Sequence, residues 1–217
     1  MQAEGNEMTG MVLYGFDGST YVRTVRMLLA EKNAHYKQVP VNVLKGEPRQ
    51  PEHMARHPFG RVPVFDHDGF RIIETGAIAS YLDEVLPGPS FTPESSKDRA
   101  RMRMAMSIVD SYGNGALIAV AGYHLFPDFI GGADEEARKR GIAGSQRVLQ
   151  ELMKLRGGSA FIAGGRPSLG DLYLAPLCFL VSLTPDANEV FAVDGFAGWW
   201  EQVQAMPSYQ ATTPRFS

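Results

Sequence analysis

The sequence predicts an α/β domain followed by an all-helical domain, and three observations support this prediction. Short apolar segments up to about residue 85 carry strand and helix patterns in turn. A stretch rich in proline and glycine, Pro87 to Pro93, then interrupts the chain. After it, every periodic segment has a helical pattern. We therefore expect domains at residues 11–87 and 94–217, joined by a linker at 88–93.

The first domain begins with a strand, a helix and a second strand. Met11 to Tyr14 is a short apolar run that ends in turn-forming residues. Between Tyr21 and Lys32, apolar residues recur at helical spacing. Val39, Val41 and Val43 then alternate with other residues at period two, which favours a strand. This order indicates a parallel crossover unit.

A hairpin and a helix are expected to complete the first domain. Val62–Phe65 and Phe70–Ile73 flank Asp66-His67-Asp68-Gly69, whose residues tolerate left-handed conformations. Thr75 can cap the following helix. The inward-facing residues of that helix are expected to be Ile78, Leu82 and Val85.

The order β-α-β, then β-β-α, is the layout of a thioredoxin-like domain, in which helices cover one mixed four-stranded sheet. Residues 45–58 show too little periodicity for more than a short irregular helix, and we expect them to be exposed. The second domain is expected to be a helical bundle. Its helices are predicted at Arg99–Leu125, Glu135–Leu155, Leu169–Leu183 and Phe196–Ala205.

Composition excludes several classes of function. The net charge of -3 provides no basic field, so nucleic acid is not an expected partner. The longest apolar run, Leu172 to Leu183, is shorter than the roughly 20 residues of a membrane span and contains Pro176. The single cysteine, Cys178, fits a reducing compartment, and the scattered histidines form no ligand pair with it. We therefore expect a cytosolic protein without a metal.

Residues 1–10 are polar and lack the features of a signal peptide, and we assign them no role.

Ser19 lies in the turn before the first expected helix. A hydroxyl at a helix start can donate to a bound thiolate and lower the pKa of a thiol, which is otherwise about 8.5. The alternative is that Ser19 only caps the helix, and Thr20 is an equally suitable cap.

Two further features precede secondary-structure elements. If the Val62-Pro63 bond is cis, it turns the Val62 backbone groups outward to pair with an extended peptide, whereas base rates favour a trans turn proline. Glu74 and Thr75 begin a helix, where backbone donors and the Thr75 hydroxyl can hold a carboxylate while Glu74 accepts from an ammonium. Taken alone, this pair is an N-terminal cap. Together with Ser19, these features match the parts of one γ-glutamyl-cysteinyl-glycine tripeptide.

At these positions the sequence resembles the serine-type glutathione transferases of the phi and theta classes. Leu13-Tyr14-Gly15 with Ser19 and Arg23 is similar to the start of these proteins. The segment from Gln50 to Pro63 is similar to the phi-class loop nearly residue for residue. Glu74-Thr75 resembles the Glu-Ser helix start of the family, and Ser168-Leu169-Gly170-Asp171 resembles its capping box.

The resemblance implies roles for individual residues. Ser19 activates the glutathione thiol, and Val62, held by Pro63, pairs with the cysteinyl backbone. Glu74 and Thr75 bind the γ-glutamyl end. Near the glycyl carboxylate, Arg49 stands where phi-class chains usually carry a lysine, and Arg61 replaces a common glutamine. His57 replaces a common asparagine, so the contacts at the glycine end depart most from the family pattern.

Tyr14 is the alternative catalytic residue, because other classes activate the thiol with a tyrosine at the end of the first strand. The spacing from Tyr14 to the following helix favours Ser19. The electrophile pocket is expected between the first-strand loop and the long helix of the second domain. Its candidate residues are Phe16, Tyr112, Tyr123 and Phe126, although aromatic residues at helical spacing also suit a core.

The leading functional hypothesis is transfer of glutathione, as co-substrate, to a small hydrophobic electrophile in detoxification. Glutathione-dependent peroxide or disulfide reduction, or isomerisation of a double bond, is the second. A non-catalytic glutathione or ligand carrier is the third, since a fold does not decide function. The resemblance also implies a homodimer.

Overall fold

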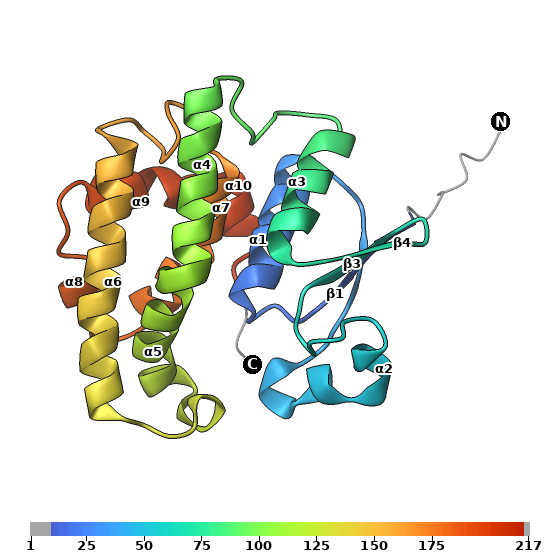
Figure 1. The fold of residues 1–217 in the computed structure, drawn as a ribbon, viewed down its shortest axis with the longest axis horizontal. Helices are drawn as coiled ribbons and strands as arrows, with labels where there is room; N and C mark the ends of the chain where they lie inside the picture. Colours follow the sequence, from blue (N-terminus) through green and yellow to red (C-terminus); the bar gives the residue numbers. More distant parts are fainter. Residues whose placement is uncertain (1–9, 215–217) are drawn as a thin grey trace. The chain divides into compact units, whose positions relative to one another are not determined.

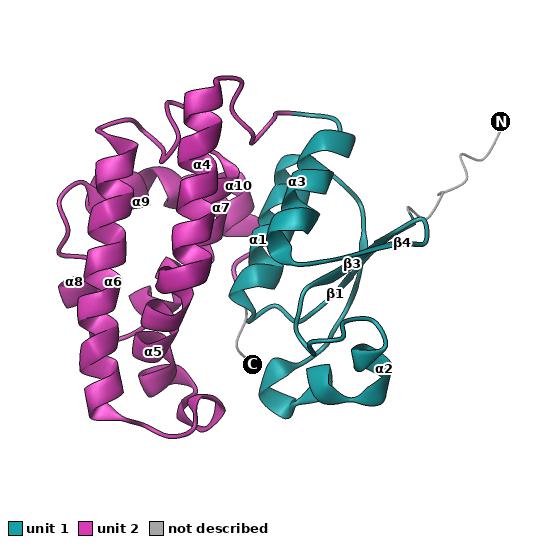
Figure 2. Ribbon diagram, in the orientation of Figure 1, with its two compact units in different colours: residues 1–88, 214–217 teal, residues 89–213 magenta. Residues whose placement is uncertain are grey.

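The computed structural model describes residues 10–214. The chain divides into two compact units, and the boundary lies between Gly88 and Pro89 (Figure 2). Within the described range, no helix is long and apolar enough to cross a membrane.

The first unit contains a mixed four-stranded sheet in the order β2-β1-β3-β4. Its strands are β1 (Met11–Tyr14), β2 (Lys37–Val39), β3 (Val64–His67) and β4 (Phe70–Ile73). β1 pairs parallel with β2 and antiparallel with β3, which pairs antiparallel with β4. The predicted thioredoxin-like arrangement is therefore confirmed.

Two helices cover one face of this sheet (Figure 1). They are α1 (Thr20–Glu31) and α3 (Thr75–Val85), which pack against each other. The short helix α2 (Pro51–Met54) belongs to the connection between β2 and β3. Fully buried apolar side chains fill the core of the unit, among them Leu13, Leu28, Phe65, Ile78 and Leu82.

The second strand is shorter than predicted. It ends at Val39, because Pro40 has no N–H to continue the ladder. Val41 is still buried, which explains the alternating pattern, but Val43 begins a 3-10 helix (η1, Val43–Lys45). Asn42 caps this turn by accepting from Leu44 N at 2.9 Å.

The connection that follows is only partly as predicted. It forms a second 3-10 turn (η2, Glu47–Arg49) and α2, in agreement with a short irregular helix. The expectation that this segment is exposed is wrong for His53 and His57, which are 3% and 2% exposed. Both rings pack beneath the loop that leads to β3.

The hairpin is confirmed, with different boundaries. β3 begins at Val64 rather than Val62, and its turn consists of Asp68 and Gly69, at φ 51 and 85. Positive φ at both turn residues is typical of a type I′ turn. At α3, Thr75 is the first helical residue and Glu74 holds the cap position, so the expected Thr75 cap is wrong. Val85 is 47% exposed and does not face inward.

The second unit is helical throughout. The four predicted helical segments are confirmed, the first of them as a continuous run in which a π-helical segment interrupts the α-helix. Two short helices near the C-terminus, one of four residues and one of five, were not predicted, because they are too short to show helical periodicity. The elements are α4 (Ser96–Ile108), η3 (Val109–Gly113), α5 (Asn114–Leu125), η4 (Pro127–Ile130), α6 (Glu135–Arg156), α7 (Leu169–Ser182), α8 (Ala187–Val190), α9 (Phe196–Gln204) and α10 (Pro207–Ala211).

A buried carboxylate anchors the start of α7. Asp171 accepts from the backbone N–H of Ser168 and of Ile162, both at 2.9 Å. The Ser168 hydroxyl bonds it at 2.7 Å, and Trp199 Nε1 donates to it at 2.8 Å. The capping box predicted at these residues is therefore present, and it also ties α9 to α7.

Candidate functional site

Ser19 is the N-cap of α1. Its backbone is extended (φ -76, ψ 126) and its Oγ accepts from Val22 N at 3.4 Å. Thr20 is the first helical residue, so Ser19 rather than Thr20 caps the helix. Because Oγ acts as an acceptor in this bond, the hydroxyl hydrogen remains a donor. The side chain is half-buried, so capping and donation to a ligand are compatible.

The turn before Ser19 approaches α1 closely. Gly15 has φ 153, and a Cβ added there would lie 2.3 Å from Val22 Cγ2. Only glycine allows this approach. Gly15 N also donates to Val39 O at 2.9 Å, which extends the pairing of β1 with β2.

The Val62-Pro63 peptide bond is cis. Val62 lies just before β3, which begins at Val64. Among the described residues, neither backbone group of Val62 pairs with another main-chain group. Its N–H and C=O can therefore pair with an extended peptide lying beside β3.

Glu74 is a non-glycine residue with a positive φ. It has φ 69 and ψ 120, and its carbonyl accepts from Ile78 N at 3.0 Å. Such a backbone costs on the order of 1–3 kcal/mol and is typically found at ligand sites. The Glu74 side chain is exposed and makes no capping bond, while Thr75 is buried beside it. The first N–H groups of α3 and the Glu74 carboxylate can therefore bind an amino-acid end group.

Two buried histidines support the loop before Val62. His53 Nε2 lies 2.7 Å from the Arg61 carbonyl oxygen, to which a ring N–H donates. His57 Nδ1 accepts from Phe59 N at 3.3 Å, and the two imidazoles stack at 6.5 Å. The bonding of His53 was missed by sequence reasoning, because nothing in the local pattern distinguishes a histidine that braces a loop from an exposed one.

Burial also affects the charge of His57. It lowers the pKa of this imidazole, and the nearby Glu74 carboxylate only partly opposes the shift. His57 is therefore a neutral ring close to Glu74, and its N–H can donate a hydrogen bond.

Two arginines flank Gly60 at the same loop. A Cβ added to Gly60 would lie 2.9 Å from Arg49 Cδ, and Arg61 follows Gly60 directly. Both arginines are exposed. In the part of the chain that the structure describes, neither guanidinium forms an ion pair, so both can bind an external carboxylate.

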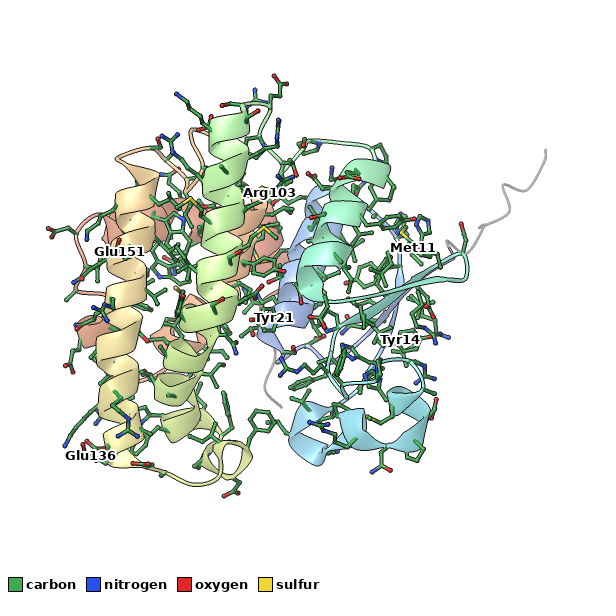
Figure 3. The ribbon with its side chains drawn as sticks, in the orientation of Figure 1. Met11, Tyr14, Tyr21, Arg103, Glu136 and Glu151 are labelled. Carbon is green, nitrogen blue, oxygen red and sulfur yellow. The ribbon has the colours of Figure 1, made fainter. Side chains whose placement is uncertain are left out.

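Tyr14 points away from the face that α1 and α3 cover. Its neighbour Leu13 is fully buried, and side chains alternate along a strand. The guanidinium of Arg56 lies over the Tyr14 ring, 4.6 Å from its centroid. Tyr14 thus lies between the sheet and the α2 segment (Figure 3).

The electrophile-pocket candidates have different surroundings. Phe16 is half-buried in the turn before Ser19. Tyr112 lies in the π-helical segment η3 and is 68% exposed. Tyr123 bonds through its hydroxyl to Glu135, which raises its pKa, and Phe126 packs edge-on to Phe129. Tyr123 is therefore engaged with α6, whereas Tyr112 is accessible.

Two other features of the described residues bear on chemistry. No group of histidine, cysteine, aspartate and glutamate there could hold a metal ion. Cys178 is fully buried, and burial raises the pKa of its thiol well above the usual value, so it is not a nucleophile at neutral pH.

Comparison with known proteins identifies the family. The family model of the glutathione S-transferase N-terminal domain matches residues 9–84. A maleylacetoacetate isomerase of Rhizobium meliloti is 34% identical over 76% of this chain and 78% of its own length. The chain belongs to the glutathione S-transferase family. The resemblance expected from the sequence is confirmed.

Solved glutathione transferases share the whole fold. Glutathione transferase F7 from Populus trichocarpa superposes with a TM-score of 0.85 at 25% identity and covers 95% of this chain and 100% of its own. Glutathione S-transferase I from mais, in complex with an atrazine glutathione conjugate, has a TM-score of 0.82 at 25% identity and covers 94% of this transferase and 96% of its own chain.

Proposed function

We propose that this glutathione transferase binds glutathione on its first unit and uses Ser19 to stabilise the thiolate for attack on a small electrophile. The observation that carries the proposal is the Ser19 hydroxyl at the start of α1, where it accepts from Val22 N and keeps its hydrogen for the sulfur. The positive end of α1 adds to this stabilisation.

The tripeptide would lie along three neighbouring segments. Val62 pairs with the cysteinyl backbone, which brings the thiol toward Ser19. The γ-glutamyl end binds at Glu74 and Thr75, where the carboxylate receives the N–H groups of α3 and Glu74 accepts from the ammonium. The glycyl carboxylate binds Arg49 and Arg61. The exposure of both guanidinium groups supports this arrangement.

The chemical step needs no protein nucleophile, because the nucleophile is the sulfur of glutathione. Glutathione loses its thiol proton to solvent, and the thiolate sulfur forms a bond to an electrophilic carbon. A leaving group departs with the electron pair, or the adduct takes up a proton. Thiolate stabilisation and proximity supply the catalysis. Phe16 stays the candidate of the first unit for contact with the electrophile. In the second unit the exposed Tyr112 is the stronger candidate, since the Tyr123 hydroxyl is bonded to Glu135 and Phe126 packs on Phe129.

Isomerisation is the second candidate function, and the relative named maleylacetoacetate isomerase favours it. The same thiolate would add to a carbon–carbon double bond conjugated to a carbonyl group. Rotation about the resulting single bond and elimination of the sulfur would give the other isomer and return glutathione unchanged.

Glutathione consumption distinguishes these two reactions. With maleylacetoacetate and less than one equivalent of glutathione, an isomerase completes many turnovers, whereas a transferase with a chlorinated aromatic substrate uses one glutathione for each product. If the protein binds glutathione but does neither, the carrier hypothesis applies.

The thiolate absorbance of bound glutathione, measured against pH, tests the proposed role of Ser19. We expect the wild type to lower the thiol pKa by at least one unit from its usual value, equivalent to about 1.4 kcal/mol. Ser19→Ala should abolish this shift and should lower kcat about tenfold. Ser19→Thr keeps the hydroxyl and the cap and should retain most of both.

Tyr14→Phe is the matched test of the alternative catalytic residue. We expect it to leave the thiol pKa unchanged, because the Tyr14 ring packs under Arg56. A pKa shift that survives Ser19→Ala and disappears in Tyr14→Phe would overturn the assignment. A homodimer and a cytosolic location remain predictions, to be tested by light scattering and by cell fractionation.

A further inference from the structure

Gln38 links β2 to the turn that carries Ser19. Its side-chain Nε2 donates to the Gly15 carbonyl at 3.0 Å and to Asp17 Oδ1 at 2.9 Å. One amide therefore holds two points of the turn between β1 and α1. This contact joins residues more than twenty positions apart in the chain.

The same Asp17 oxygen also pairs with α1. Arg26 Nη1 lies 3.2 Å from Asp17 Oδ1, and the Arg26 side chain is only 13% exposed. Asp17 is thus held from the strand side by Gln38 and from the helix side by Arg26. Asp17 itself is half-exposed, so this arrangement lies at the edge of the site rather than in the core.

Among the described residues, the other backbone bonds of the turn lie at its two ends, and at the first end Gly15 N donates to Val39 O at 2.9 Å. Gly15 and Gly18 on either side of Phe16 and Asp17 allow a wide range of backbone conformations. At its end, Ser19 is held by the Ser19 N to Phe16 O bond of 3.1 Å and by the long bond of its Oγ with Val22 N. A misplacement of about 1 Å at a catalytic group can cost about a hundredfold in rate.

The charge of Asp17 also matters. A carboxylate two residues from Ser19 opposes ionisation of a thiol bound there. Pairing with Arg26 offsets this charge, and the hydrogen bond from Gln38 orients the carboxylate toward β2.

We propose that Gln38 is a positioning residue for Ser19: by binding Gly15 and Asp17 it fixes the turn and so the direction of the Ser19 hydroxyl. The inference rests on the proposed role of Ser19. Gln38 does not touch the reacting atoms, and its effect is transmitted through the turn. Arg26 completes the arrangement by balancing Asp17.

A double-mutant cycle tests this inference. Gln38→Met keeps the length of the side chain and removes both hydrogen bonds. We expect it to raise the pKa of the bound glutathione thiol and to lower kcat about fivefold to twentyfold, on the order of 1–2 kcal/mol, with a smaller change in KM for glutathione. In the Ser19→Ala background, Gln38→Met should have no further effect on the thiol pKa.

Two more variants make the test specific. Gln150→Met is the matched control, because Gln150 is exposed on α6. Gln38→Glu keeps the size and polarity of the side chain but turns a carboxylate toward two acceptors, so it should raise the thiol pKa at least as much as Gln38→Met. It keeps the test decisive if Gln38→Met folds poorly, as judged by circular dichroism.

The outcomes separate this inference from the proposed function. If wild type lowers the thiol pKa, Ser19→Ala loses that shift, and both Gln38 variants keep it, Gln38 is not a positioning residue although Ser19 stays the activating group. An equal effect of Gln38→Met with and without Ser19 would also overturn the inference. If the wild type does not lower the thiol pKa, the proposed role of Ser19 is wrong, and the role of Gln38 that rests on it is wrong as well.

Discussion

Lys32 Nζ lies 2.9 Å from Asp83 Oδ1, and each of these side chains is only 1% exposed. Lys32 Nζ also donates to the Asp83 carbonyl at 3.1 Å. The pair joins the C-terminal end of α1 to α3, the two helices whose N-termini carry Ser19 and Glu74. Their relative placement therefore depends in part on a buried charge pair.

Breaking this pair should be costly. Asp83→Ala leaves the Lys32 ammonium buried without its carboxylate, so we expect the free energy of unfolding to fall by about 3–5 kcal/mol. Urea unfolding measures the change. Lys154→Ala, which removes an exposed pair with Glu151, should change it by less than about 1 kcal/mol. Comparable losses for both variants would contradict this account.

Even a near-isosteric substitution of the buried Asp171 should lower the stability of the protein. Asp171→Asn replaces one acceptor oxygen by an NH2 group. This group would face either the donors of Ile162 and Trp199, which bond Oδ1, or the Ser168 N–H, which bonds Oδ2, so at least about 2 kcal/mol of stability should be lost. Asp98→Asn in the first turn of α4, where the side chain is 32% exposed, is the control and should stay within about 0.5 kcal/mol. The thermal midpoint of each variant reports the difference.

Acid should weaken the second unit through Asp186. Hydrogen bonding from Arg138 lowers the pKa of this carboxyl, with a smaller contribution from His124. A carboxyl whose pKa is lower in the folded state adds stability above its unfolded pKa of about 3.9, and that stability is lost as pH falls through the folded value.

Unfolding free energies measured between neutral pH and pH 3 test this effect. Asp186→Asn should be less stable than wild type at neutral pH, and the two should converge as the pH falls. The exposed Asp128→Asn should follow the wild-type curve. A constant difference between Asp186→Asn and wild type at every pH would show that the Asp186 charge is not responsible.

His57 should affect glutathione binding more than turnover. His57→Leu removes the acceptor for Phe59 N in the loop before Val62, so we expect the dissociation constant for glutathione to rise several-fold, about 1 kcal/mol. His57→Asn can still accept this bond and should bind nearly as wild type. Isothermal titration calorimetry measures both. Equal weakening in the two variants would indicate that ring packing matters rather than the hydrogen bond.

Sequence reasoning succeeded where local patterns carry the information. The period-two and helical patterns located the four strands and the long helices, and local motifs placed Ser19 and Glu74 at the starts of helices, where the structure has them. It failed at Val43, because Pro40 ended the strand while Val41 stayed buried. It also failed at Val85, where helical spacing continued beyond the packed face.

Other features could not be read from the sequence because they depend on contacts between distant residues. Gln38 reaches Asp17 from another strand, and the spacing of neither residue predicts this contact. The bond from His53 to the Arg61 carbonyl depends on how the loop folds back. Glu74 has a positive φ between β4 and α3, a conformation that its residue type does not predict.

The π-helical segment η3 sets how α5, which continues the same helical run, is rotated about its axis. A π turn contains about one residue more than an α turn, so it rotates the downstream helix by about 100°. Leu117, Val120 and Ala121 of α5 are fully buried, so the rotation of α5 about its axis decides whether they stay in the core. Deleting one residue from 109–113 would therefore leave the sequence of α5 unchanged but rotate the helix about its axis, so that its buried apolar side chains would face a different direction.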